Sequence, residues 1–278
     1  MAQRWLARGD QVTALTRSAE RAGRLIEAGM GVHVGDVTDA SSLQTLPIAD
    51  VVLYAVSYDR HSASKREDVV VSGLAGALEV LADKTRRLIY ISTSSVYGVS
   101  NGGWVDETTP TEPANESGRL ALEAEGLVRA SPLEAIQLRM TGIYGPGRLL
   151  RRIEQMAARE PIAGEGDAWL NLIHVDDAAR AVELAADRLL GRLDAAAQPD
   201  RTFLVSDDEP IRRRDYYARL ARAARAPAPV FDPGAGGSRI IGVGKRCRND
   251  RVKEELGLTL EHPRVTEEQF KKMLAIGS

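Results

Sequence analysis

The sequence is poor in cysteine, histidine and aromatic residues. Its 278 residues include one cysteine, four histidines and only 5% Phe, Trp and Tyr. A single cysteine excludes a disulfide framework and a zinc knuckle of paired thiols, so we expect a reducing compartment, the cytoplasm. His33, His61 and His262 follow no metal-ligand spacing. The spacing therefore predicts no metal site.

The sequence also lacks an excess of charge of either sign. Its 37 basic and 39 acidic side chains leave a net charge of -2. Without a global positive field we expect neither nucleic acid nor an anionic membrane as a partner. No apolar run approaches the roughly 20 residues that a membrane-spanning helix needs, and the first residues lack the apolar core of a secretory signal. Small molecules remain as the expected partners.

Short apolar runs alternate with amphipathic stretches along most of the chain. This alternation is typical of βαβ units on a parallel sheet, so we predict an α/β fold. The predicted strands span 12–15, 32–34, 50–56, 87–92, 133–139, 170–173 and 202–205. The predicted helices span 19–28, 41–46, 65–83, 114–130, 149–158 and 175–190, with loops at 102–113 and 142–147 and two more helices after 205.

The start of the chain departs from a complete doubly wound sheet. Such a sheet has its first strand in the middle of the order 3-2-1-4-5-6, and glycines after that strand admit the dinucleotide pyrophosphate. Residues 4–9 instead resemble the end of the first helix, which makes 12–15 the second strand. We therefore expect an unpaired edge on the second and fourth strands. A misplaced start codon or a decayed gene fragment would explain it.

Five short motifs follow one another in a family's order. Together they resemble the extended short-chain dehydrogenase/reductase superfamily, which includes nucleoside-diphosphate-sugar epimerases and dehydratases. The resemblance implies an NAD(P)-binding, Rossmann-like doubly wound fold, here incomplete at its start, and activity on a sugar nucleotide or a small carbonyl or hydroxyl compound. The motifs are GDVTD at 35–39, DVV at 50–52, ISTSSVYG at 91–98, LRMTGIYGPG at 138–147 and IHVDDA at 173–178.

The resemblance implies how the adenosine half of the cofactor is held. Asp36 would accept a hydrogen bond from the exocyclic amine of adenine, and Val37 would pack on the ring. Arg17 ends the second predicted strand, where family members that use NAD carry an acidic residue and those that use NADP carry arginine. Arg17 therefore favours NADP(H) over NAD(H). The alternative is an arginine that is merely exposed at a helix start.

Further positions follow from the same resemblance. Ala55 and Val56 end the fourth strand with small side chains that leave room for the nicotinamide ribose, and Ser92 lies at the end of the fifth strand. These three are candidate cofactor residues. Thr141 and Arg148 are candidate substrate residues in the motif that follows the sixth strand.

The catalytic residues of the superfamily are only partly present. A Ser or Thr hydroxyl polarises the substrate, a Tyr exchanges the proton, and a Lys four residues later lowers the pKa of that phenol. Thr93 matches the hydroxyl position. The register set by Gly118 and Glu125 puts Ser117 and Ala121 where the Tyr and Lys belong. A serine hydroxyl titrates far too high to replace a phenol near neutral pH.

Two functions remain open after this departure. The protein could be an atypical oxidoreductase or epimerase with a substitute acid or base, for which Asp106, Glu107, Glu116 and Tyr144 are candidates. Alternatively it binds the dinucleotide without turnover, as a sensor or scaffold whose fold the cofactor stabilises by mass action. Loss of turnover in Thr93→Ala would favour the enzyme.

The expected organisation places the substrate in a crevice between two parts. A dinucleotide-binding domain would comprise 1–144 and 170–205, and a small substrate lobe 145–169 and 206–278. Arg139, Arg148 and Arg246 could meet a diphosphate. His174 and Asp176 are expected to tie a strand end to the next helix rather than to bind a ligand. A homodimer is one possible assembly, because helices of this family often pair.

Overall fold

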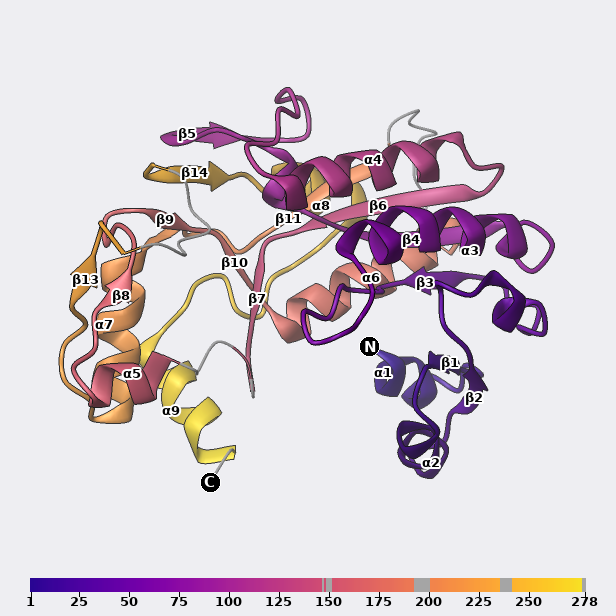
Figure 1. Ribbon diagram of the computed structural model, residues 1–278, viewed down its shortest axis with the longest axis horizontal. Helices are drawn as coiled ribbons and strands as arrows, with labels where there is room; N and C mark the ends of the chain where they lie inside the picture. Colours follow the sequence, from indigo (N-terminus) through magenta and orange to yellow (C-terminus); the bar gives the residue numbers. More distant parts are fainter. Residues whose placement is uncertain (147, 149–151, 193–200, 236–241, 277–278) are drawn as a thin grey trace. The chain divides into compact units, whose positions relative to one another are not determined.

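The computed structural model describes residues 1–146, 148, 152–192, 201–235 and 242–276 (Figure 1). The chain divides into two compact units. Unit 1 comprises Met1–Ser92, Glu116–Leu138 and Val182–Thr202, and unit 2 comprises Thr93–Asn115, Arg139–Ala181 and Phe203–Ser278. The expected dinucleotide-binding domain and substrate lobe are defined by function, and their bounds differ from those of the two units. That division stays a prediction.

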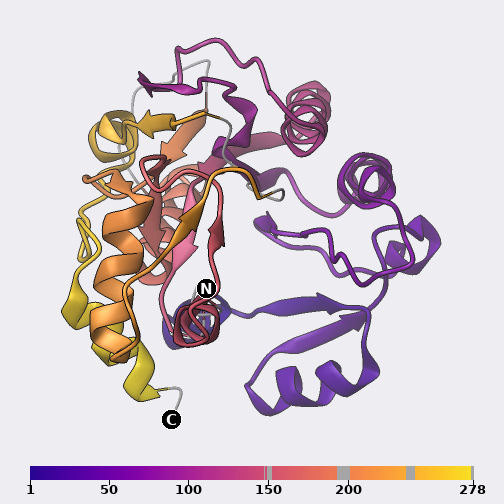
Figure 2. The same ribbon diagram turned by 60° about the vertical axis from the view of Figure 1, so that its left-hand side comes forward.

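Unit 1 begins with a helix followed by a β-α-β segment. Its elements are α1 (Ala2–Ala7), β1 (Thr13–Thr16), α2 (Ala19–Glu27) and β2 (Gly31–Val34). Ser18 caps α2, since its side chain accepts a hydrogen bond of 3.2 Å from the backbone N–H three residues later. β1 and β2 pair in parallel, and α2 packs on this pair (Figure 2).

A second group of elements in the chain builds a larger sheet. The elements are η1 (Ala40–Leu43), β3 (Val52–Tyr54), η2 (Asp68–Ser72, a π-helix), α3 (Gly73–Leu81), β4 (Arg87–Thr93), α4 (Glu116–Ala130), β6 (Glu134–Met140) and β11 (Thr202–Val205). The sheet has the order β11-β6-β4-β3, with β3 and β4 parallel.

The core of unit 1 follows the apolar periodicity of its helices. Residues of α3 at spacings of three and four form one buried face, as the sequence predicts. They pack with apolar residues of η1, β3, β4 and α4. The buried cluster includes Leu43, Tyr54, Leu74, Ala77, Leu78, Leu81, Leu88, Tyr90, Ala124 and Val128.

β1 and β3 belong to different sheets. Within the described residues, β1 pairs with β2 alone and β3 pairs with β4 alone. β1 and β3 correspond to the second and fourth strands of the expected topology. In the part of the chain that the structure describes, each of them has one edge that pairs with no strand. This is the arrangement expected from the sequence.

Unit 2 contains short paired strands. β5 (Asn101–Val105) is parallel to β14 (Gly244–Cys247), and β7 (Gly142–Tyr144) is parallel to β10 (Leu172–His174). β9 (Trp169–Leu170) is antiparallel to β12 (Ile211–Arg212), and β8 (Ile162–Ala163) is parallel to β13 (Phe231–Asp232). Segments far apart in the sequence thus lie side by side.

Helices complete unit 2 and enclose its core. They are η3 (Ser94–Val96), α5 (Arg152–Ala157), α6 (Val175–Leu189, which continues into unit 1), α7 (Arg213–Ala224), α8 (Asp250–Leu256) and α9 (Glu267–Ile276). The core cluster includes Tyr144, Met156, Ile162, Leu172, Tyr216, Leu220, Val265 and Phe270. Among the described residues, no helix is both long and apolar enough to cross a membrane.

The structure differs from the sequence expectations in several places. The predicted strand 170–173 is instead two short strands, β9 and β10, with different partners, and the predicted helix 41–46 is the 3-10 helix η1. Two predicted loops contain strands, β5 and β7, because each pairs with a strand that lies far away in the sequence. The single helix predicted over 65–83 is instead the π-helix η2 followed by α3. The segment after 205 holds three helices rather than two. Tertiary pairing overrides local sequence preference at β5 and β7.

Candidate functional site

The carboxyl ends of β1 and β2 bring two predicted cofactor residues together. Nη1 of Arg17 lies 3.7 Å from Oδ2 of Asp36. Oδ1 of Asp36 accepts hydrogen bonds of 2.9 Å from the backbone N–H and the hydroxyl of Thr38. The side chains of Arg17 and Asp36 are 49% and 32% exposed, so a ligand can reach both. Val37, in contrast, is buried in the core of unit 1.

The predicted residues at the ends of β3 and β4 have different surroundings. Ala55 and Val56 are exposed directly after β3. Ser92 is buried, and its hydroxyl donates a hydrogen bond of 2.6 Å to Oε1 of Glu125 on α4. This bond ties β4 to α4 and gives Ser92 a structural partner. Its role toward the cofactor stays a prediction.

The start of α4 carries Ser117, which lies at the position of the missing tyrosine. Ser117 is exposed, and its Oγ accepts a hydrogen bond of 3.2 Å from Nη1 of Arg66. The Arg66 guanidinium also lies over the Tyr58 ring, 4.7 Å from the ring centroid. Ala121 is buried. A cation from the segment after β3, which itself lies over a tyrosine ring, thus contacts Ser117.

Thr93 is the last residue of β4 and the first residue of unit 2. Oγ1 of Thr93 accepts a hydrogen bond of 3.2 Å from the backbone N–H of Ser95 and donates one of 3.1 Å to the Ser95 hydroxyl. The next residues line a pocket of about 200 Å³. Its lining comprises Ser94, Ser95, Tyr97, Gly98, Val99, Ala114, Asn115, Trp169, Leu170, Asn171, Gly244 and Lys245.

Lys245 brings a cation into this pocket. Its Nζ donates a hydrogen bond of 3.1 Å to the backbone carbonyl of Tyr97. Burial lowers the pKa of Lys245 below that of a free lysine. A lysine with a lowered pKa can exchange a proton closer to neutral pH than an exposed one. Sequence reasoning missed Lys245, because no motif places it near the turn after β4.

The other predicted polar residues of unit 2 are mostly engaged in holding the fold. Nη1 of the buried Arg139 donates a hydrogen bond of 2.7 Å to the Tyr97 hydroxyl, and burial raises the pKa of Tyr97 to about 12. The hydroxyl of the buried Thr141 donates a hydrogen bond of 3.0 Å to the backbone carbonyl of Val205. Arg148 is exposed in a bridge to Gly145. Substrate roles for Thr141 and Arg148 stay predictions.

The substitute acids expected from the sequence also have structural surroundings. Oε1 of Glu107 accepts a hydrogen bond of 2.6 Å from the backbone N–H of Leu204, and burial raises the pKa of Glu107. Asp106 caps the turn that contains Thr108 and Thr109. Tyr144 is completely buried and Glu116 is exposed at the start of α4. None of the four lines the pocket beside the turn after β4.

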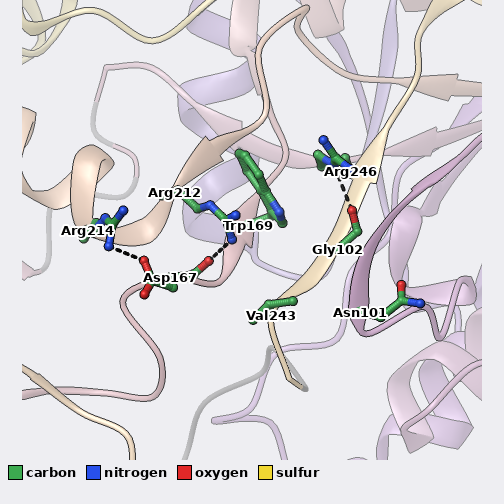
Figure 3. Close-up of a pocket in the computed structure, with 8 residues that line it drawn as sticks. All are labelled: Asn101, Gly102, Asp167, Trp169, Arg212, Arg214, Val243 and Arg246. Carbon is green, nitrogen blue, oxygen red and sulfur yellow. Dashed lines mark hydrogen bonds and ion pairs between the residues drawn. The ribbon is translucent and has the colours of Figure 1, made fainter.

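A larger pocket of about 500 Å³ in unit 2 is rich in arginine (Figure 3). The Arg212 guanidinium lies 3.7 Å from the centroid of the Trp169 ring, and that of Arg246 lies 5.3 Å from it. Arg246 also donates 2.8 Å from Nε to the carbonyl of Gly102. Arg214 forms an ion pair with Asp167. The lining comprises Asn101, Gly102, Asp167, Trp169, Arg212, Arg214, Val243 and Arg246.

This pocket offers the chemistry for an anionic ligand with a planar group. Guanidinium groups bind phosphate or carboxylate through two parallel hydrogen bonds, and an indole ring offers a stacking surface. Trp169 lines both pockets, so they are neighbours. Of the residues expected to meet a diphosphate, only Arg246 lies here. Trp169 was missed, although the scarcity of aromatic residues could have drawn attention to tryptophan.

Comparison with known proteins assigns the chain to a family. The model described as NAD dependent epimerase/dehydratase family matches residues 1–192. The chain belongs to this family. It is 26% identical over 268 residues to Protein YeeZ of Escherichia coli strain K12, which covers 94% of this chain and 89% of that protein. The extended short-chain dehydrogenase/reductase resemblance is confirmed.

Solved structures agree with this assignment. A putative NAD-dependent epimerase/dehydratase from Methylobacillus flagellatus is 30% identical, with a TM-score of 0.75 over 99% of this chain and 93% of that one. UDP-glucose 4-epimerase of Thermus thermophilus, solved in complex with NAD, has a TM-score of 0.79 over 99% of this chain and 93% of that one. At 18% identity it supports the fold alone. The predicted Rossmann-like α/β fold is confirmed.

Proposed function

We propose that the protein is an NADP(H)-dependent oxidoreductase or epimerase that acts on an anionic small molecule, with a sugar nucleotide as the leading candidate. The observation that carries this proposal is the arginine-rich pocket around Trp169 in unit 2. Its volume of about 500 Å³ lies in the range of small-molecule sites. The diphosphate would pair with Arg212 or Arg246, whose guanidinium groups lie over the Trp169 ring.

The adenosine side of the cofactor fits the end of β1. Arg17 and Asp36 lie side by side there, with the Asp36 carboxylate fixed through Thr38. Arg17 would bind the 2'-phosphate of NADP, and Asp36 would accept from the adenine amine. The exposed Ala55 and Val56 would border the nicotinamide ribose. When bound, the nicotinamide supplies or accepts the hydride of the reaction.

The turn after β4 and Lys245 would provide the polar chemistry. The Thr93 hydroxyl would hydrogen-bond to the reacting oxygen of the substrate. Lys245 would hold or release the proton that the family's tyrosine exchanges, because burial lowers its pKa. Ser94, Ser95 and Lys245 line one pocket, which supports this pairing.

A second function is supported by the start of α4. Ser117 and Ala121 lack the phenol and the ammonium of the family's catalytic pair. A protein that binds the dinucleotide without turnover, as a sensor or scaffold, would need neither. The expected domain division, the homodimer and the cytoplasmic location remain part of the proposal in either case.

The test is hydride exchange against a panel of sugar nucleotides and small carbonyl compounds. The purified protein would be incubated with each compound and either NADPH or NADP+, absorbance of the reduced cofactor would be followed, and the product would be analysed for an inverted stereocentre, because an epimerase leaves the cofactor unchanged overall. We expect turnover with at least one anionic compound and its loss in Thr93→Ala. NADPH binding without turnover on any compound would support the sensor instead. No binding of NADPH or NADH would overturn both functions.

A further inference from the structure

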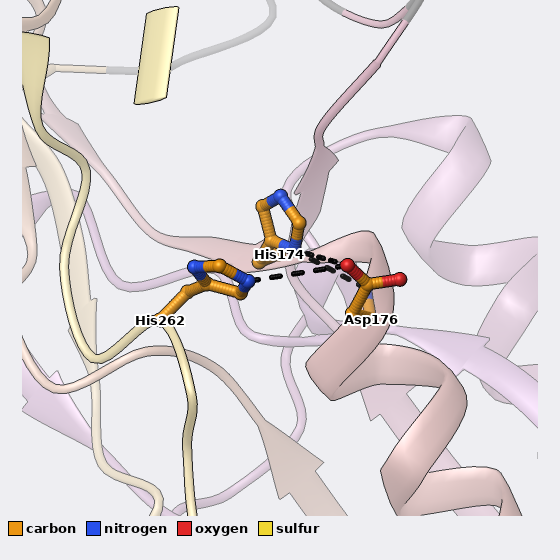
Figure 4. Close-up of side chains that lie close together, drawn as sticks. All are labelled: His174, Asp176 and His262. Atoms are coloured by element: carbon orange, nitrogen blue, oxygen red, sulfur yellow. Dashed lines mark hydrogen bonds and ion pairs between the residues drawn. The ribbon is translucent and has the colours of Figure 1, made fainter. Parts of the chain in front are cut away.

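Two histidines and one aspartate from separate segments meet in unit 2 (Figure 4). His174 ends β10, Asp176 lies in the first turn of α6, and His262 lies in the segment before α9. One donor atom from each residue lies within 4.8 Å of the donor atoms of the other two. Sequence spacing could not show this cluster, because 86 residues separate Asp176 from His262.

The distances leave room for an ion between the donor atoms. Nδ1 of His174 lies 3.5 Å from Oδ2 of Asp176, and Nε2 of His262 lies 3.9 Å from the same oxygen. The second distance is too long for a hydrogen bond, and the first is at the outer limit. Four ligands about 2.0 to 2.2 Å from a tetrahedral zinc ion lie roughly 3.4 Å apart. Nδ1 of His174 also accepts a hydrogen bond of 3.3 Å from the backbone N–H of Asp176, which an ion on that nitrogen would displace.

The backbone around His262 is fixed by the neighbouring acidic residue of α6. Both carboxylate oxygens of Asp177 accept hydrogen bonds of 2.9 Å, one from the N–H of Glu261 and the other from that of His262. The imidazole rings of His174 and His262 are already adjacent, with centroids 3.7 Å apart. The donors are therefore held near one another without an ion.

We propose that His174, Asp176 and His262 form a binding site for one divalent transition metal ion of the zinc class. Two imidazoles and one carboxylate are a donor set that zinc accepts with a water in the fourth position. The Asp176 side chain is 54% exposed, so solvent can reach that position. The ion would join the start of α6 to the segment before α9 and stabilise unit 2.

Gln269 provides a way to tune the site. Its Nε2 lies 3.0 Å from Nδ1 of His262, while its Oε1 accepts 2.7 Å from the N–H of Thr266. Metal on Nε2 of His262 places a proton on Nδ1, which then needs an acceptor. Gln269→Glu offers a carboxylate oxygen to that proton and keeps an acceptor for Thr266. This variant should bind the metal more tightly.

The test is metal titration of the full chain, purified without a polyhistidine tag. Zinc binding would be measured by calorimetry, and cobalt would report the donor set through its visible absorption. We expect one ion per chain, a higher midpoint of thermal unfolding with zinc, and at least about 10-fold weaker binding in Asp176→Asn and His262→Asn. His61→Asn removes an exposed histidine outside the cluster and should bind as the unmodified protein does.

The Asp176 side chain is 54% exposed, so Asp176→Asn should fold normally. This variant keeps the test decisive even if a histidine variant fails to fold. Tighter zinc binding by Gln269→Glu would support the proposed geometry at His262. Absence of stoichiometric zinc binding would overturn the proposal. Equal affinity in Asp176→Asn and the unmodified protein would also overturn it, since any bound ion would then lie elsewhere.

Discussion

The end of β4 and the start of α4 are the two places where the family resemblance predicts catalytic residues, and they differ in what they carry. At the end of β4, the Thr93 hydroxyl is held by Ser95, and Lys245 faces the adjoining pocket. At the start of α4, Ser117 has only a hydroxyl, bonded to Arg66. The hydroxyl motif is intact while the phenol and ammonium are gone. In the proposed register, proton chemistry therefore depends on a residue outside the usual pair.

Substitution of the two cations should separate these regions most strongly. Lys245→Met removes the proposed proton carrier, and we expect kcat to fall about 100-fold or more. Arg66→Met removes a cation of similar length beside Ser117 and should change kcat only a few-fold. Steady-state kinetics on a compound that is turned over would measure both. A larger loss in Arg66→Met would reverse the assignment and place the chemistry at α4.

The buried side of α4 should matter for stability rather than chemistry. Glu125 is fully buried and accepts 2.6 Å from the Ser92 hydroxyl. Glu125→Ala leaves that hydroxyl without this acceptor and opens a cavity, so the free energy of unfolding should fall by about 2 to 4 kcal/mol. Glu123→Ala, on the exposed side of the same helix, should change it by less than about 0.5 kcal/mol. Urea unfolding of the two variants gives the comparison.

The larger pocket should govern substrate affinity. Trp169→Leu removes the stacking surface between the guanidinium groups of Arg212 and Arg246. We expect KM for an anionic substrate to rise about 10-fold, with kcat little changed. Trp5→Leu, in α1 of unit 1 and outside the lining of this pocket, is the matched control. Equal KM in Trp169→Leu and the unmodified protein would remove the pocket from the substrate site.

A smaller effect concerns the pH dependence of stability. Asp207 is 2% exposed, and burial raises its pKa to about 8. Between about pH 4 and 8 the folded protein therefore holds a proton that the unfolded chain has released, and stability falls as pH rises. Asp207→Asn removes this contribution. From pH 6 to pH 7 the free energy of unfolding should therefore fall by about 1 kcal/mol less in this variant than in the unmodified protein. Denaturant titrations of both proteins at the two pH values measure the difference.

Much of unit 1 could be predicted from the sequence, because its elements follow local periodicity. The apolar spacing along α3 and the helix predicted over 19–28 match the structure. The separation of β1 from β3 also followed, since it depends on topology alone. The π-helix η2 was missed, because a single wide turn leaves the apolar face nearly unchanged.

The candidate site was harder to predict, because long-range pairing assembles it. Arg17 and Asp36 could be placed together, since both follow neighbouring parallel strands. The pairing of β14 with β5 brings Lys245 and Arg246 into unit 2's pockets, and no local pattern reports that pairing. The same limit hid the His174 and His262 pair. Residues on regular βαβ units were predictable, and residues on short paired strands were not.

The most direct test is the ratio of dissociation constants for NADH and NADPH, measured by fluorescence titration. We expect the protein to bind NADPH more tightly than NADH. In Arg17→Ala this preference for NADPH should fall by at least about 10-fold. Arg21→Ala, an exposed arginine of α2, should leave the ratio unchanged. Equal or tighter binding of NADH by the unmodified protein would contradict the assignment of Arg17 to the 2'-phosphate and, with it, the proposed cofactor.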